Sequence, residues 1–288
     1  MKLGAIEAGG TKFVCATGDE KLNIDKRIAF PTTTPEETLA RTIAFFKENP
    51  VDALGIGSFG PIDLRPESPT YGYVTSTPKP GWANTDFLGT LRSALAIPAA
   101  WTTDVNEAAF GEMTLGVSQA DDTSIYVTIG TGIGAGVVNR HALYVGRTHP
   151  EVGHFILHRQ PDDTMVSTCP YHENCAEGLA AGPAVNKRAG MAAKDVPADN
   201  PLWTIEANYI AQLCVDLTLA FAPDKIILNG GVMHQTQLFN LVRREFSELL
   251  NDYVNTPPLT EYIVPAGLGE ESGVIGGLAL ARETRRSN

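Results

Sequence analysis

The sequence predicts an α/β fold arranged as two domains. Short apolar runs of strand length alternate with longer amphipathic runs of helix length, which is typical of sheets covered by crossover helices. The 288 residues are enough for two ordinary domains, and a hydrophobic share of 43% is enough for their cores. The same order of elements is also predicted twice. Both IEAGGTKFVCATG and TIGTGIGAGVVN indicate a strand, a Gly-rich turn and a second strand. Two domains that each begin with such a hairpin predict a cleft between them.

The apolar runs define the expected elements. Strands are predicted at Leu3–Ile6, Phe13–Ala16, Ala53–Gly57, Ala99–Thr102, Ile125–Ile129, Ala135–Val138, Lys225–Leu228 and Tyr262–Val264. Helices are predicted at Pro35–Lys47, Asn106–Leu115, Trp203–Phe221, Gln237–Leu250 and Gly273–Glu283. The first helix has a clear start, with Thr34 as N-cap, Pro35 at the first position and Glu37 at the third.

The domain boundary is expected near Thr103–Asn106. Residues 1–105 would form a smaller N-terminal domain and residues 106–272 a larger one. A C-terminal helix of about residues 273–288 would pack back on the smaller domain.

The overall composition limits the kinds of binding partner and the cellular compartment that we expect for this chain. A net charge of −11 argues against a sequence-independent DNA or RNA binder, which needs a basic face. Neither a signal-peptide pattern nor an apolar stretch of about 18 residues is found, so we expect no membrane partner. Four cysteines do not make a disulfide framework, and Cys15 and Cys214 have the apolar neighbours of core residues. The expected location is the reducing cytoplasm.

The stretch EVGHFILHRQPDDTMVSTCPYHENC carries a zinc pattern. His154, Cys169, His172 and Cys175 would supply two imidazoles and two thiolates, which is a closed tetrahedral set. Such a set normally stabilises structure, although thiolate–imidazole sites also accept cobalt or iron. Two cysteines alone could be small buried hydrophobes. With both histidines present, the sequence predicts a structural Zn²⁺ that fixes a loop between Glu151 and Glu177.

Three Gly-rich turns are candidates for contact with nucleotide phosphates. They are Glu7–Lys12, Thr128–Gly134 and Leu228–Val232. Glycine lets backbone N–H groups approach an anion closely, although any one of these turns could be an ordinary tight β-turn. None matches Gly-x4-Gly-Lys-Ser/Thr, and the second is followed by a strand-like run, which disfavours a dinucleotide-binding βαβ unit. Three turns in one chain favour a nucleotide held between the domains.

Asp104 has two interpretations from the residues alone. It lies where a predicted strand ends and a predicted helix begins, which is a common place for an exposed functional carboxylate. The same position, with Glu107 three residues later, is also typical of a helix N-cap. The pattern does not decide between the two.

Eight motifs together resemble the ROK family of sugar kinases, within the actin/hexokinase-like (ribonuclease H-like) superfamily. In chain order these are IEAGGTKF, GIGSFGP, TPKPGW, TDVNEAAFGE, TIGTGIGAG, HPEVGH, CPYHENC and LNGGVM. They run from residue 6 to about residue 233 and are most similar to the zinc-containing bacterial fructokinases of that family. The resemblance implies ATP- and Mg²⁺-dependent phosphorylation of D-fructose to fructose 6-phosphate by a homodimer.

The resemblance also implies residue roles. Asp104 would be the general base that takes the proton from the sugar hydroxyl. The sugar would be bound by Gly60, Thr77, Thr103, Asp104, Glu151, His154 and Glu177. ATP would be bound by Gly9, Gly10, Thr11, Lys12, Thr131, Gly132, Gly230 and Gly231. Magnesium would bridge the phosphates and neutralise charge on the transferred group.

Three features depart from the common family pattern. Glu7 stands where many relatives have Asp, Thr103 replaces an Asn, and the metal loop is Cys-x2-His-x2-Cys instead of a three-cysteine version. The first and third match the fructokinase branch. The alternatives are a hexokinase preferring mannose or glucose, a ROK sugar-sensing regulator and an actin-like filament protein. A regulator would carry a DNA-binding helix-turn-helix before the first strand, which is predicted to begin at Leu3.

Overall fold

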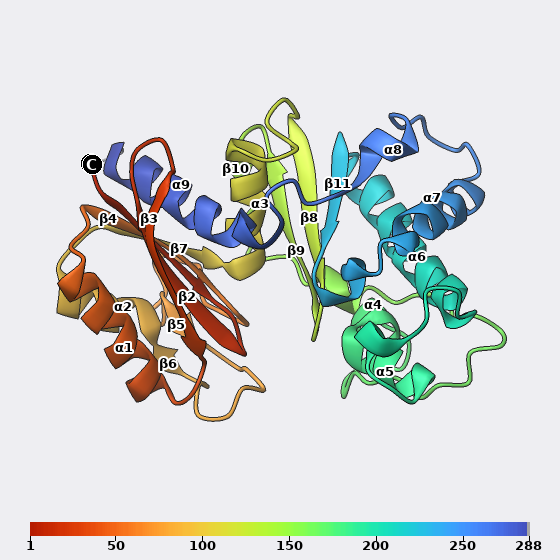
Figure 1. Cartoon of the computed structure of the whole chain (residues 1–288), viewed down its shortest axis with the longest axis horizontal. Helices are drawn as coiled ribbons and strands as arrows, with labels where there is room; N and C mark the ends of the chain where they lie inside the picture. The colour runs from red at the N-terminus through yellow and green to blue at the C-terminus, as the bar shows by residue number, and fades with distance from the viewer. Residues whose placement is uncertain (287–288) are drawn as a thin grey trace. The chain divides into compact units, whose positions relative to one another are not determined.

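The structure, a computed structural model, describes residues 1–286 and divides into two compact units. Unit 1 contains Met1–Gln119, Ala142–His149 and the chain from Glu270 onward, and unit 2 contains Ala120–His141 and Pro150–Gly269. The last two residues of the predicted C-terminal helix lie outside the described residues. Figure 1 labels most of the helices and strands of each unit. The predicted α/β class is confirmed.

Unit 1 contains both strands and helices. They are β1 (Leu3–Ala8), β2 (Lys12–Gly18), β3 (Ile24–Pro31), α1 (Pro35–Glu48), β4 (Ala53–Ser58), β5 (Tyr73–Val74), β6 (Thr85–Asp86), α2 (Phe87–Leu95), β7 (Ala99–Thr103), α3 (Asp104–Thr114), β10 (Ala142–Leu143) and α9 (Ser272–Arg286). A short 3-10 turn, η4 (Gly269–Glu271), precedes α9 in the chain.

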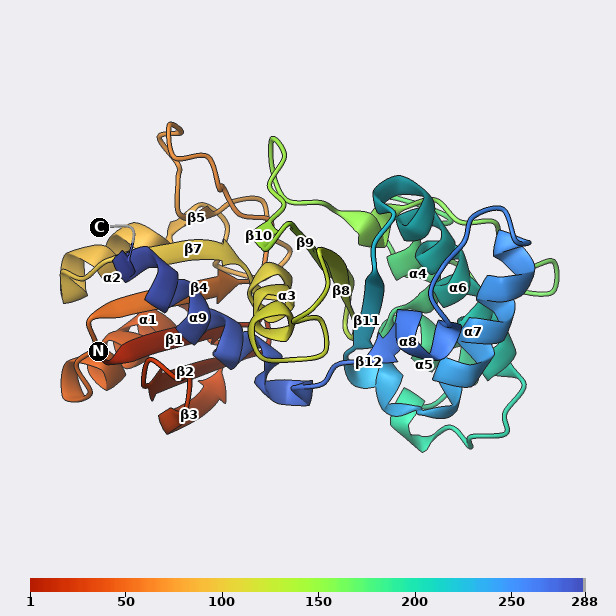
Figure 2. The ribbon, with the colours of Figure 1, turned by 90° about the horizontal axis from the view of Figure 1, so that it is seen from above.

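The sheet of unit 1 has the strand order β3-β2-β1-β4-β7, which Figure 2 shows with α9 lying across the strands. The first three strands are antiparallel neighbours, whereas β1, β4 and β7 run parallel. Side chains alternate between the two faces. Ile6 packs into the core shared with α1 and α2, and Glu7, its neighbour in sequence, faces α9.

Helix α9 packs backbone against backbone on its neighbours. A methyl group added to Gly55 of β4 would come within 2.0 Å of the Gly277 carbonyl oxygen in α9. One added to Gly111 of α3 would come within 2.1 Å of the Ser272 carbonyl oxygen. Both contacts are closer than any side chain permits, so glycine is required where these elements cross.

Unit 2 repeats the hairpin-then-parallel arrangement. Its elements are β8 (Thr123–Ile129), β9 (Ile133–Asn139), η1 (Val152–His154), α4 (Ala176–Ala180), α5 (Gly182–Ala189), η2 (Ala193–Asp195), α6 (Leu202–Phe221), β11 (Lys225–Asn229), η3 (Gly231–His234), α7 (Gln237–Leu250), α8 (Leu259–Tyr262) and β12 (Ile263–Pro265). The strand order within the unit is β9-β8-β11-β12, with β8 and β9 antiparallel and the others parallel. The twofold occurrence of a strand–turn–strand hairpin is therefore confirmed.

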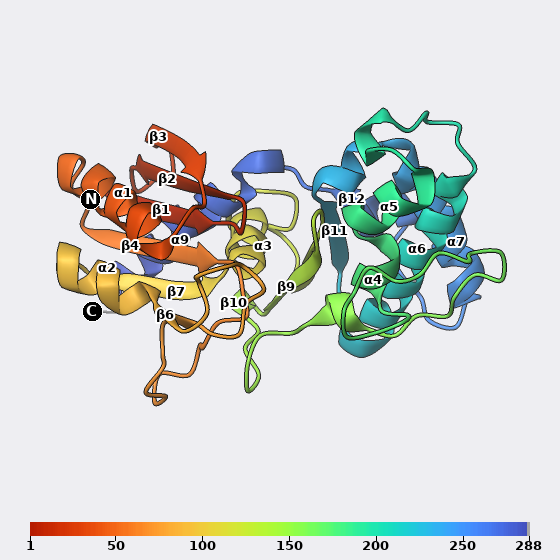
Figure 3. The ribbon, with the colours of Figure 1, turned by 90° about the horizontal axis from the view of Figure 1, so that it is seen from below.

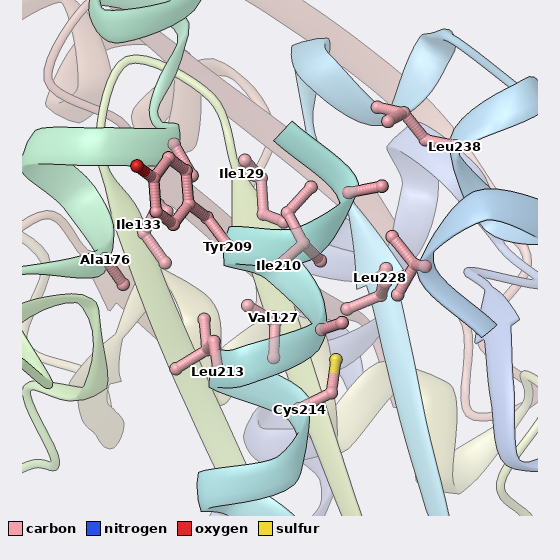
Figure 4. Close-up of a cluster of buried hydrophobic side chains, with 14 of the residues drawn as sticks. Val127, Ile129, Ile133, Ala176, Tyr209, Ile210, Leu213, Cys214, Leu228 and Leu238 are labelled. Atoms are coloured by element: carbon pink, nitrogen blue, oxygen red, sulfur yellow. The ribbon is translucent and has the colours of Figure 1, made fainter. Parts of the chain in front are cut away.

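Helix α6 forms the centre of the core of unit 2. Figure 4 shows Tyr209, Ile210, Leu213 and Cys214 of this helix directed toward the apolar side chains of the strands. Helices α4, α5 and α7 pack around α6, and Figure 3 shows α4 and α5 beside it. Cys15 and Cys214 are buried and free, as the sequence predicts.

Most predicted elements are confirmed, with small errors at their ends. The last strand begins at Ile263, one residue later than predicted, because Tyr262 still belongs to the short helix α8. Sequence patterns missed β3, α2, α4 and α5. Strand β3 has mostly exposed residues and carries the charged run Asp25–Arg27, so it lacks the apolar run that the other strands have. None of the helices formed by residues 1–286 is both long and apolar enough to cross a membrane.

Candidate active site and metal centre

In unit 1 the ends of three parallel strands bring predicted site residues to one edge of the sheet. Strand β1 ends at Ala8, β4 at Ser58 and β7 at Thr103, and these strands are neighbours in register. The Phe59 amide donates to the Ala8 carbonyl oxygen at 2.7 Å, which continues the ladder beyond β4. The first Gly-rich turn, Gly60 and Asp104 therefore follow adjacent strand ends, where α/β sheets commonly place their ligand-binding residues.

Asp104 is the first residue of α3, and the N-cap is Thr103. The Thr103 hydroxyl accepts a hydrogen bond from the Asn106 amide at 3.2 Å. The N-cap interpretation of Asp104 is therefore wrong. One carboxylate oxygen of Asp104 accepts from the Val105 amide at 2.9 Å, and the side chain is half-buried. A carboxylate at the first helical position is favoured by the helix dipole. Thr103, predicted as a sugar ligand, is buried with its hydroxyl used in this cap.

Two further carboxyl groups lie in the electrostatic surroundings of Asp104. Burial, with the negative charge of Asp104 as the second cause, raises the pKa of Glu7 to about 7. Burial also raises the pKa of Glu107 well above its ordinary value, and the charges of Glu7 and Asp104 add to this effect. Sequence reasoning considered Glu107 only as part of a capping box and missed its burial. The spacing Asp104-x-x-Glu107 places the two carboxyl groups on one helix face, because residues three apart are neighbours there, but it gives no sign of burial.

The first Gly-rich turn is a short hairpin loop whose tip is accessible. The Gly9 amide donates to the Lys12 carbonyl oxygen at 2.9 Å and closes the loop. A methyl group added to Gly10 would have no atom within 4 Å. Thr11 and Lys12 are exposed. An exposed turn that combines glycine amides, a hydroxyl and an ammonium group is chemically suited to bind a polyphosphate.

The remaining predicted sugar residues of unit 1 lie on loops. Gly60 is half-buried, and a methyl group added to it would lie 3.5 Å from Nε2 of His149. Thr77 is half-buried, and its hydroxyl accepts from the Lys79 amide at 3.2 Å. This hydrogen bond shapes the loop Thr77–Trp82.

In unit 2 the second and third Gly-rich turns lie together. Strands β8 and β11 are parallel neighbours that end at the same edge, where Thr128 pairs with Asn229. The Gly130 amide donates to the Gly132 carbonyl oxygen at 2.9 Å and closes the second turn. A methyl group added to Gly130 would lie 4.0 Å from the Gly231 amide nitrogen. Thr131 and Gly231 are exposed, so both turns present backbone groups at the surface of this unit.

Gly230 is required for the third turn. Its φ is +98°, a conformation that L-residues with side chains rarely adopt. A methyl group here would also lie 2.6 Å from the Ile129 carbonyl oxygen. The turn can therefore pack against the end of β8 only with glycine at this position.

Glu177 links α4 to the second turn. One of its carboxylate oxygens accepts from the Ile133 amide at 3.0 Å, and it would lie 2.6 Å from a methyl group on Gly132. Glu151, also predicted as a sugar ligand, is exposed and precedes the short helix η1 that carries His154. The His154 amide donates to the Glu151 carbonyl oxygen at 3.0 Å, which fixes the two residues in one turn.

The structure brings together the four predicted metal ligands. One ligand atom each from His154, Cys169, His172 and Cys175 lies within 4.8 Å of the others. The Cys169 sulfur is 3.9 Å from Nδ1 of His154 and 3.7 Å from Nδ1 of His172. A tetrahedral zinc site with thiolate and imidazole ligands has sulfur–nitrogen separations of about 3.6 Å. The donor set therefore fits zinc in both chemistry and spacing.

Backbone amides and an arginine support this cluster. The Tyr171 amide donates to the Cys169 sulfur and the Gly178 amide to the Cys175 sulfur, each at 3.4 Å, and contacts of this kind orient metal ligands. Arg159 donates to the Met165 carbonyl oxygen at 2.6 Å and to the Glu173 carbonyl oxygen at 3.0 Å. The guanidinium thereby joins both ends of the loop that carries Cys169 and His172.

Comparison with known proteins gives one family over nearly the whole chain. The ROK family profile matches residues 3–284. A fructokinase of Pediococcus pentosaceus is 60% identical over 282 residues, which cover 98% of each chain. A fructokinase of Streptococcus mutans is 47% identical over 286 residues, which cover 97% of each chain. The crystal structure of a ROK hexokinase from Thermus thermophilus matches with a TM-score of 0.84 at 26% identity, covering 100% of each chain. The resemblance drawn from the motifs is confirmed, and the chain belongs to the ROK family.

Proposed function

We propose that this chain is a fructokinase, which transfers the γ-phosphoryl group of ATP to the C6 hydroxyl of D-fructose. The observation that carries the proposal is the near-full-length identity, 60% and 47%, to two relatives named fructokinase. A second support is the position of Asp104, which follows a strand end on the same edge of the sheet as the first Gly-rich turn of unit 1.

Asp104 is the proposed general base. Its carboxylate accepts the proton of the C6 hydroxyl while the hydroxyl oxygen forms a bond to the γ-phosphorus. The bond from that phosphorus to the bridging oxygen breaks, and ADP leaves with the electron pair. The Val105 amide orients one carboxylate oxygen of Asp104. Burial raises the pKa of Glu107 well above its ordinary value, which favours the uncharged acid beside the base.

The Gly-rich turns are the proposed phosphate-binding elements. In unit 1 the proposed phosphate-binding residues are Gly9, Gly10, Thr11 and Lys12. In unit 2 they are Thr131 and Gly132. The Lys12 ammonium is exposed on the first turn and can approach a phosphate oxygen. Gly230 and Gly231 support the nucleoside. Magnesium, bound with ATP, supplies positive charge to the phosphate oxygens.

Six residues besides Asp104 are the proposed sugar ligands. Glu151, His154 and Glu177 belong to unit 2, and Gly60, Thr77 and Thr103 belong to unit 1. Carboxylates suit this role because each can accept hydrogen bonds from two neighbouring hydroxyls. Glu177 already accepts from the Ile133 amide, so its position is fixed before any sugar binds.

The cluster of His154, Cys169, His172 and Cys175 is the proposed zinc site. A closed set of two thiolates and two imidazoles has no open position, so the metal, when bound, contributes loop stability and no reaction step. The loop it fixes runs between Glu151 and Glu177. The metal therefore supports the geometry of the proposed sugar ligands. A reducing cytoplasm, which we propose as the location, keeps both thiols available.

The test is ADP release from MgATP by zinc-loaded protein with fructose, mannose, glucose or no sugar. The fructokinase proposal predicts that fructose gives the largest kcat/KM and that release without sugar is low. A larger kcat/KM for mannose or glucose would replace fructose as the substrate and leave the kinase chemistry standing. The absence of any sugar-dependent release would favour a sugar-binding regulator. Sedimentation velocity of the same sample tests the proposed homodimer.

A further inference from the structure

Thr32 connects the first Gly-rich turn to the rest of unit 1. It directly follows β3 and is buried, with 6% of its surface exposed. Its amide donates to the Thr11 carbonyl oxygen at 2.9 Å, and its hydroxyl donates to the Gly9 carbonyl oxygen at 2.7 Å. Two hydrogen bonds from one residue therefore fix the backbone on both sides of Gly10.

The loop Thr77–Trp82 is attached to the same short segment. The Lys79 ammonium donates to the Thr32 carbonyl oxygen at 2.9 Å. The indole N–H of Trp82 donates to the Thr33 carbonyl oxygen at 2.8 Å. We name Thr32, Thr33, Lys79 and Trp82 the Thr32 bracket.

The bracket is anchored in the core. Trp82 is fully buried, and its ring centroid lies 5.6 Å from that of Phe13 and 5.2 Å from that of Phe59. The Thr33 amide donates to the hydroxyl of Thr38 in α1 at 3.1 Å. Thr32 and Thr33 therefore have a fixed position, and Lys79 is the charged, half-buried group of the bracket. A charged donor makes a stronger hydrogen bond than a neutral one.

We propose that Thr32 and Lys79 are positioning residues that couple the loop Thr77–Trp82 to the turn Gly9–Lys12. The inference rests on the proposed function, in which the first segment contacts the sugar and the second contacts the phosphates of ATP. A sugar that orders the loop also holds the Lys79 ammonium on Thr32, and Thr32 holds the phosphate-binding turn. Sugar and MgATP then bind with positive coupling, which is reciprocal by thermodynamic linkage. We expect sugar to tighten nucleotide binding about tenfold.

The test measures the dissociation constant of a magnesium complex of a non-hydrolysable ATP analogue by calorimetry, with and without saturating fructose. The variants are Lys79→Met, which removes the ammonium, and Thr32→Val, which removes the hydroxyl at similar volume. The coupling ratio is the dissociation constant without fructose divided by the dissociation constant with fructose. Each variant should reduce this ratio toward one. Lys79→Arg and Thr32→Ser keep a donor and should restore most of it. The double variant should lose no more coupling than either single variant, because both act through one connection.

Several outcomes would overturn the coupling. If fructose leaves the dissociation constant of the wild type almost unchanged, there is no coupling. If Lys79→Met and Thr32→Val both keep the coupling ratio of the wild type, these two residues do not carry the coupling. A third outcome also overturns the coupling. If Lys79→Met lowers nucleotide affinity equally with and without fructose, and this loss adds to that of Thr32→Val, Lys79 contacts the phosphates directly.

Hydrogen exchange of the backbone amides at residues 9–12, measured without ligands, tests the connection independently of catalysis. Exchange should be faster in Lys79→Met than in Lys79→Arg. Equal exchange rates in these two variants overturn the connection even if fructose is phosphorylated. No fructose-dependent ADP release by the wild type would instead refute the proposed function.

Discussion

Replacement of Glu7 by glutamine should stabilise unit 1 above pH 7 and leave its stability near pH 4.5 almost unchanged. Burial, with the charge of Asp104 second, raises the pKa of Glu7 from 4.5 to about 7. The folded unit therefore holds the carboxyl proton more tightly than the unfolded chain does. This contribution to stability is complete below about pH 4.5 and is lost as the pH rises through about 7.

The size of the effect follows from the two pKa values. A tenfold difference in proton affinity corresponds to about 1.4 kcal/mol, so a rise from 4.5 to about 7 corresponds to about 3 kcal/mol at pH 8. Glutamine does not ionise and has nearly the volume of the protonated acid. The free energy of unfolding of Glu7→Gln should therefore exceed that of the wild type by about 3 kcal/mol at pH 8.

Urea unfolding followed by tryptophan fluorescence measures this difference. A Trp203→Phe background leaves Trp82 and Trp101, both buried in unit 1, as the reporters. The protein is studied without nucleotide and without added magnesium. Glu48→Gln, which makes the same substitution at an exposed glutamate of α1, is the matched control. A stability difference between Glu7→Gln and the wild type that stays constant from about pH 4.5 to about pH 8 would refute the reasoning.

Three other substitutions test the proposed site. Asp104→Asn should lower kcat by about 10²- to 10⁴-fold while calorimetry still detects ATP and sugar binding, because only proton transfer is lost; near-normal turnover excludes Asp104 as the base. Cys169→Ser should lose zinc, measured by elemental analysis, and lower the Tm; an unchanged zinc content contradicts the four-ligand assignment. Glu151→Gln should raise the KM for fructose about tenfold or more with little change in the KM for ATP, and equal increases in both would rule out a sugar-specific contact.

The sequence predicted the elements that bury an apolar run. Strands such as Ile125–Ile129 and helices such as Gln237–Leu250 were found because their side chains alternate or repeat with one clear period. Helix α2 (Phe87–Leu95) is only nine residues long, so few repeats of its period are present. Strand β3 lies at the edge of its sheet and has mostly exposed side chains, so burial leaves no pattern in its sequence.

The candidate site was predictable where ligand type and spacing are informative. The cluster of two cysteines and two histidines forms in unit 2 because three ligands lie three residues apart and His154 is fixed by η1. The burial of Glu107 could not be predicted, because it depends on glycines far away in sequence. A methyl group on Gly57 would lie 2.3 Å, and one on Gly277 2.4 Å, from a Glu107 carboxyl oxygen. Long-range contacts of this kind have no local pattern.

The packing of α9 has a consequence for how the chain is made. Unit 1 is discontinuous, since its sheet forms from residues before unit 2 while α9 is synthesised after the whole of unit 2. Until α9 leaves the ribosome, the glycine-lined face of β4 and α3 lacks the backbone that fits it. The polypeptide of unit 2 is complete by residue 269 and can fold earlier. Premature termination anywhere before α9 therefore leaves the segment that carries Asp104 without its final support, so incomplete chains should be preferred substrates for proteolysis.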